Sequence, residues 1–352
     1  MYTGKVYGLK DMARWTRFET LWFVFYIVLW VSIYHFLNLH WFTIPWTPMA
    51  LIGTAVAFMI GFQNNSVYSR IWEARKIWGG IVNTSRTFGV FAQDMIENPQ
   101  DKGDPESNKK LQEEIKVLTY RHIAWMTALR HAMRQGKPWE TTNRHKTNRE
   151  WGIFPPEREI DVKTDMSPYL SEEDMDYTMS KSNHQTALLY LQSHHLKKLK
   201  NDGILWEFSF LEMEGVIKEL FNLQGKTERI KNFPYPRQYA SLNRYFMWVL
   251  LLFLPMAMIP QFVDIGDVIK DNHPLLGEFF IWFSIPIYIA IAWIFHTMER
   301  IGRTGENPFE GTANDVPIST ISRGIEIDLR QNLGENKEEI PPALKDQSGV
   351  QF

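Results

Sequence analysis

The sequence contains no cysteine among its 352 residues. This absence excludes disulfide bridges, thiolate zinc sites, iron–sulfur clusters and cysteine nucleophiles. Neither positive nor negative charge dominates, because the sequence has 38 Lys and Arg and 40 Asp and Glu. A polybasic nucleic-acid-binding protein is therefore not the expected class. The sequence also lacks a Gly-rich phosphate loop, a nucleophile elbow and an HExxH motif. We therefore expect no catalytic residues, no bound metal and no cofactor, and do not expect an enzyme.

Charged residues are missing from three long stretches, residues 20–69, 245–263 and 279–298. A helix needs about 20 apolar residues to cross the hydrocarbon core of a membrane. The first stretch has room for two such helices, with Pro45 and Pro48 marking a turn between them. Buried helices of a soluble protein are the alternative, but so long an uncharged stretch favours a membrane protein. The sequence thus predicts four transmembrane helices, at about 18–38, 47–68, 245–263 and 278–298.

Lys and Arg flank the predicted spans on one side of the membrane. They precede the first and third spans and follow the second and fourth, at Lys5, Lys10, Arg14, Arg17, Arg70, Arg75, Lys76, Arg86, Arg237, Arg244, Arg300 and Arg303. The loop between the first two spans has no Lys or Arg, and residues 264–278 contain only Lys270. In membrane proteins, the loops on the cytoplasmic side carry an excess of Lys and Arg. Both termini and the region 70–244 are therefore predicted to be cytoplasmic.

The region between the second and third spans predicts helices and no strands. Apolar residues recur at three- and four-residue spacing in residues 107–135, 182–200 and 204–231. The expected fold is an all-α membrane protein with a large helical cytosolic part. Its segments are a cytosolic N-terminal segment 1–17, spans 18–68, a cytosolic region 69–244, spans 245–298, a cytosolic segment 299–333 and a flexible tail 334–352.

The second span is the most informative segment. Thr54, Phe58 and Phe62 recur every four residues and so share one helix face. The next four residues, Gln63, Asn64, Asn65 and Ser66, are polar and uncharged, which a lipid-facing helix does not tolerate. One interpretation is a water-filled path with an apolar constriction above a polar vestibule. The other is ordinary bundle packing with amide hydrogen bonds between helices, and spacing alone does not decide between them.

Three sequence blocks resemble the bestrophin family, most closely its bacterial branch. They lie at residues 60–79 (IGFQNNSVYSRIWEARKIWG), 228–236 (ERIKNFPYP) and 306–318 (ENPFEGTANDVPI), in the family's order around the four spans. The resemblance implies a homopentameric ion channel in a cell membrane, the bacterial inner membrane, with helix two lining an axial pore. Its partners would be other copies of itself, permeant inorganic ions and the lipid bilayer, with no nucleic acid.

The resemblance also assigns two constrictions. The family's pore neck maps to Thr54, Phe58 and Phe62, and Thr54 departs from the usual isoleucine. A second, cytosolic aperture maps to Ile204 by the Asp-x-Ile pattern, or to Phe208 by counting back from Pro236, and we prefer Ile204. The family's animal members bind calcium after Asn-Pro-Phe, but here that stretch contains only two carboxylates, where calcium takes six to eight oxygens.

Selectivity and conduction stay open at this stage. Animal and plant relatives pass anions, which favours chloride, whereas the bacterial branch includes cation-passing members. The acidic residues Asp264, Asp267, Asp271 and Glu278 in the outer loop favour cations if they line the mouth. A non-conducting membrane scaffold is the third hypothesis, and it predicts that Phe58 and Phe62 pack within one subunit.

Overall fold

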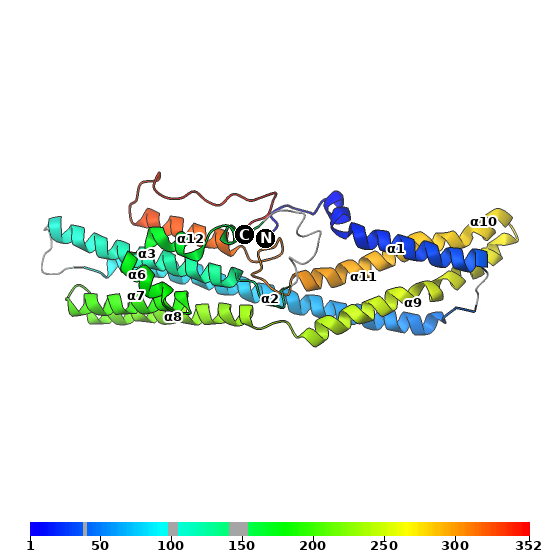
Figure 1. The fold of residues 1–352 in the computed structure, drawn as a ribbon, viewed down its shortest axis with the longest axis horizontal. Coiled ribbons are helices and arrows are strands. Elements are labelled where there is room, and N and C mark those ends of the chain that lie inside the picture. The colour runs from blue at the N-terminus through cyan, green and yellow to red at the C-terminus, as the bar shows by residue number, and fades with distance from the viewer. Residues whose placement is uncertain (38–40, 98–104, 141–153) are drawn as a thin grey trace.

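The computed structural model describes residues 1–37, 41–97, 105–140 and 154–352. It is an elongated bundle in which the membrane-type helices occupy one end and the charged helices the other, with both chain termini where the two halves meet (Figure 1). Within the described residues there are helices and only isolated β-bridges. The predicted all-α class is confirmed.

Among the described residues, four helices are long and apolar enough to span a membrane. The first three are α1 (Leu9–Leu37), α2 (Trp46–Asp94) and α9 (Arg237–Lys270), and the fourth is assembled from α10 (Pro274–Phe279), the 3-10 turn η4 (Phe280–Phe283) and α11 (Ser284–Thr304). The predicted spans lie inside these helices, except for position 38, which falls outside the described residues. The helices are longer than the spans, because each continues past the apolar stretch into polar sequence.

The charged half consists of α3, α7, α8 and α12 with shorter helices between them. Their bounds are α3 (Pro105–Arg134), η2 (Pro156–Arg158), α5 (Val162–Met166), η3 (Ser167–Tyr169), α6 (Glu172–Met179), α7 (His184–Asn201), α8 (Glu207–Asn232) and α12 (Ile318–Asn332). The three helices predicted from periodicity correspond to α3, α7 and α8. However, α8 begins at Glu207, three residues later than predicted, because residues 202–206 form the turn that reverses the chain.

The helix α2 connects the two halves without a break. It has 49 residues, so it extends for about 73 Å. At one end Val56 and Ile60 join the apolar core of the membrane half, and at the other end Trp78 and Phe88 join the core of the charged half. One rigid element therefore fixes the position of the membrane helices relative to those of the charged half.

The C-terminal tail differs from the flexible segment that its composition predicts. Ile340, Val350 and Phe352 are buried, and the backbone N–H of Thr320 donates to the carbonyl oxygen of Phe352 at 2.7 Å. An isolated β-bridge also pairs Tyr2 with Val350. Three apolar side chains in a polar stretch thus anchor the tail on the molecule, and average composition did not reveal them.

Candidate functional site

The residues predicted to form the neck lie in an exposed row on the membrane half of α2. Phe58 and Phe62 are 65% and 66% exposed, their ring centroids are 5.9 Å apart, and Thr54 is exposed one turn earlier. The opposite face of the same turns is buried, with Val56 and Ile60 in the core. Within the described residues, a single subunit therefore leaves most of the surface of the row Thr54, Phe58 and Phe62 uncovered.

The four polar residues after Phe62 divide into two pairs. Gln63 is 2% exposed and accepts a hydrogen bond at 2.7 Å from the side-chain amide of Asn243 on α9. Asn64 is half-buried and donates to the carbonyl oxygen of Met298 on α11. Asn65 and Ser66 are exposed. Gln63 and Asn64 thus make the amide contacts between helices that bundle packing predicts, and only Asn65 and Ser66 extend the exposed row.

Behind Gln63 lies a buried carboxylate, Glu306. Its side chain is 1% exposed and forms an ion pair at 3.1 Å with Arg237, the first residue of α9. The side-chain amide of Gln63 donates to Glu306 at 3.5 Å. Burial raises the pKa of Glu306 from its ordinary 4.5 to about 7, and Arg237 limits the rise. This contact joins α2, α9 and the segment after α11 at the end of the membrane half that meets the charged half.

The three sequence blocks quoted above meet at this level. Arg70 in the first block donates to the carbonyl oxygens of Ile230 and Phe233 in the second. Gln63 in the first block contacts Glu306 in the third. The blocks are far apart in the chain, so the motifs mark the junction where α2, α8, α9 and α11 are joined, which spacing alone did not show.

The two candidates for the cytosolic aperture lie in different surroundings. Ile204 precedes α8, is half-buried against the core of the charged half, and its carbonyl oxygen accepts a hydrogen bond from the backbone of Glu97. Phe208 lies in the first turn of α8 and is 81% exposed, beside the exposed Trp206 and Leu211. Gly203, at φ +75°, makes the tight turn that places this apolar group at the end of the bundle.

The loop after Asn-Pro-Phe uses its carboxylates internally. The Asp315 carboxylate accepts hydrogen bonds from the backbone of Gly311 and Thr312 and from the Thr312 hydroxyl. The Glu310 carboxylate accepts one from the Asn307 amide. The described residues contain no cluster of three or more metal-ligating side chains. The loop is a turn closed by its own side chains.

Comparison with known proteins decides the family. The model of bacterial and fungal bestrophin proteins matches residues 18–270 of this chain. The chain belongs to the bacterial/fungal bestrophin family.

The alignments with related proteins extend over most of this bestrophin. A voltage-dependent anion channel-forming protein of Ralstonia nicotianae is 26% identical over 317 residues, which are 89% of this chain and 85% of that protein. A protein of the same description from Escherichia coli is 24% identical over 313 residues, covering 86% and 84%. A solved bacterial bestrophin homologue from Klebsiella pneumoniae is 20% identical, with a TM-score of 0.68 over 91% of this chain and 99% of that one. At this identity the structural match shows the fold alone.

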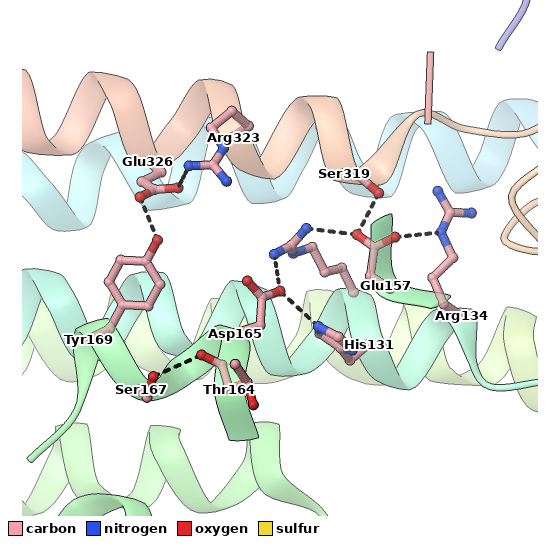
Figure 2. A network of polar contacts seen from close by, with 11 residues as sticks. His131, Arg134, Glu157, Thr164, Asp165, Ser167, Tyr169, Ser319, Arg323 and Glu326 are labelled. Atoms are coloured by element: carbon pink, nitrogen blue, oxygen red, sulfur yellow. Dashed lines mark hydrogen bonds and ion pairs between the residues drawn. The ribbon is translucent and has the colours of Figure 1, made fainter. Parts of the chain in front are cut away.

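This bestrophin also contains a buried ionic network that the sequence analysis missed. Glu157 on η2 lies between α3 and α12, where Figure 2 shows it beside Arg134 and Ser319. Its carboxylate accepts hydrogen bonds from Arg130 on α3 and Ser319 on α12, and lies 3.6 Å from the guanidinium of Arg134 on α3. Asp165 on α5 pairs with Arg130 and with His131. The Arg130 and Arg134 guanidinium groups hold the pKa of Glu157 below its ordinary value despite its burial.

A sequence signal for this network did exist. Arg130 and Arg134 are one turn apart in a stretch of α3 where nearly every residue is buried. Buried arginines need acidic partners. The partners, however, come from η2 and α5, which periodicity did not predict, so the pairing could not be assigned.

Proposed function

We propose that this bestrophin is a homopentameric ion channel in which five copies of α2 surround an axial pore. The observation that carries the proposal is the exposed row Thr54, Phe58 and Phe62, which one subunit leaves uncovered although Phe58 and Phe62 are large and apolar. In a ring of subunits this row would form the neck, and a ring of Phe side chains can restrict water and ions.

Two further features support a pore over contact with lipid. Below Phe62 the exposed face continues with Asn65, Ser66 and Ser69, polar groups that need water or partners at membrane depth. At the far end of the bundle, a second constriction requires an apolar side chain free to reach the axis. Of the two candidates, the exposure of Phe208 favours it over the half-buried Ile204.

We propose that the channel selects anions, in particular chloride. Two relatives bear the description of voltage-dependent anion channel-forming proteins. Phenylalanine rings also present electropositive edges, which a ring of Phe58 and Phe62 would turn toward a permeating anion. Monovalent-cation selectivity is the second candidate, favoured by the exposed acids Asp264, Asp267, Asp271 and Glu278 around the α9–α10 connection.

The proposed setting is the cell membrane, the bacterial inner membrane, with both termini in the cytoplasm. Four spans return the chain to its starting side, and the two termini lie together at the junction of the halves (Figure 1). A non-conducting scaffold remains the contrasting hypothesis. It requires Phe58 and Phe62 to pack within the subunit, and both are about two-thirds exposed.

The test is planar-bilayer current from the purified protein under a potassium chloride gradient. A reversal potential near that of chloride supports the anion channel, and one near that of potassium supports the cation channel. Phe58→Ala and Phe62→Ala should increase the current, because each removes a ring from the neck. Phe25→Ala is the matched control, since Phe25 on α1 is 67% exposed but lies outside the row. Equal effects at Phe25 and Phe58, or a purified protein that forms no ring, would contradict the proposal.

The same recording decides the aperture residue. Replacing Phe208 with alanine should change conductance or selectivity, whereas Ile204→Ala should mainly loosen the core against which Ile204 packs. The reverse result would assign the aperture to Ile204.

A further inference from the structure

A cavity of about 440 Å³ lies at the junction of the two halves. Its walls come from the start of α1, the stretch of α2 from Asn64 to Ile71, the end of α11, the loop around residue 312 and the C-terminal residues. Ligand pockets typically measure about 300–1,000 Å³, so the volume suits a small molecule. In its wall, α2 contributes the last turn of the second predicted span together with Ile71 just beyond it, and α11 contributes residues just beyond the fourth span. This puts the cavity where the bilayer meets the cytosol.

The lining of this cavity is apolar and aromatic. Tyr7, Trp15, Tyr68 and Phe352 contribute rings from four separate segments, and the rest of the lining is divided between aliphatic residues, two glycines and polar side chains. Trp15 is fixed from outside the lining, because the guanidinium of Arg300 lies 4.2 Å from its ring centroid and donates to its carbonyl oxygen. An apolar chain would be covered here on several sides.

Asp11 gives the cavity its charge. In the lining drawn from the described residues it is the one charged side chain, and it makes no hydrogen bond or ion pair within the described part of the chain. It is in the first turn of α1, where the helix dipole favours an ionised carboxylate. Lys10 and Arg14 are exposed neighbours on the same helix but do not line the cavity.

We infer that this cavity binds an amphiphile with an apolar chain and a positively charged ammonium head. Aromatic faces attract an ammonium group and a nearby carboxylate neutralises it, whereas the carboxylate would repel a fatty acid. The position at the membrane boundary allows the chain to enter from the bilayer while the head stays near water. This ligand class is separate from the permeant ions, and the inference does not depend on conduction.

The experiment is native mass spectrometry of the purified protein released from a neutral detergent. The probes are tetradecyltrimethylammonium and tetradecanoate, which have alkyl chains of similar length and opposite charge. We expect the ammonium probe to bind about tenfold more tightly than the carboxylate, the effect of one favourable charge contact of about 1.4 kcal/mol. Asp11→Asn should remove this preference while leaving chain binding, because Asp11 is exposed and unpaired.

Two further variants make the result specific. Ala313→Leu places a larger side chain in the lining and should weaken both probes. Glu338→Gln removes an exposed carboxylate that is outside the lining and should behave like the wild type. Melting temperatures establish that each variant is folded.

Three results would overturn the inference. They are equal binding of the two probes, a preference that survives Asp11→Asn, and binding only to dissociated subunits. The last would mean that a neighbouring copy fills the cavity in the assembly.

Discussion

Replacing Glu306 with glutamine should make this bestrophin more stable at about pH 8 and leave its stability nearly unchanged at about pH 4. The folded state holds the Glu306 proton more tightly than the unfolded state, since burial raises its pKa from 4.5 to about 7. Between these values the folded chain binds more protons, so stability falls as pH rises. A rise of this size corresponds to about 3 kcal/mol lost by the wild type above its folded-state pKa.

The glutamine variant is suited to this test because it resembles the protonated acid. Its amide oxygen can still accept the hydrogen bond from Gln63, and Arg237, whose side chain is 41% exposed, can turn to water when its partner loses the charge. The measurement is the melting temperature in a mild detergent across this pH range. The difference between variant and wild type should grow by roughly 5 °C toward alkaline pH.

The difference between the two proteins also separates Glu306 from other titrating groups. His122, for example, is fully buried in α3, and burial lowers its pKa to about 3, which opposes the trend of Glu306. Its effect is the same in both proteins and cancels in the comparison. A difference in melting temperature between variant and wild type that stays constant at all pH values would refute the reasoning. So would a variant that becomes less stable relative to the wild type as pH rises.

The remaining predictions concern the packing of each half. Glu157→Gln should lower the free energy of unfolding by about 3–5 kcal/mol, because Arg130 and Arg134 would lose their buried counter-charge, and chemical denaturation in detergent measures this loss. Gly266→Ala should cost about 1–3 kcal/mol, since an added Cβ would lie 2.6 Å from the carbonyl oxygen of Gly277, where α9 and α10 cross. For that variant the melting temperature is the assay, and an unchanged value would show that the crossing can open without cost.

Local sequence signals were sufficient for the helices but not for their contacts. The charge-free stretches predicted all four spans because membrane insertion depends on the composition of each segment itself. The start of α8 was placed too early because Ile204, which fits its apolar pattern, belongs instead to the turn at Gly203. Periodicity does not distinguish an apolar residue in a helix from one packed just before it.

The polar residues of the junction show why the site was only partly predictable. Gln63 and Asn65 look alike in sequence, yet one is buried and the other exposed. The difference comes from Asn243 and Glu306, which are distant in the chain. In the folded protein both lie within hydrogen-bonding distance of Gln63. A polar run can therefore be recognised in the sequence, but which members face water depends on tertiary contacts.

These contacts have a consequence for how the proposed neck could open. Two contacts fix the orientation of α2 about its own axis, in which Phe62 faces away from the rest of the subunit. They are the hydrogen bond of Gln63 with Asn243 on α9 and, further along, the ion pair between Glu73 and Arg229 of α8 at 3.0 Å. Beyond that, α2 joins the core of the charged half through Trp78. Turning the whole helix would break all of these contacts together, whereas a change of rotamer at Phe58 or Phe62 breaks none of them. For the proposed neck, opening by movement of the rings would therefore be the less costly route, and it would need no rearrangement of the helices in the charged half.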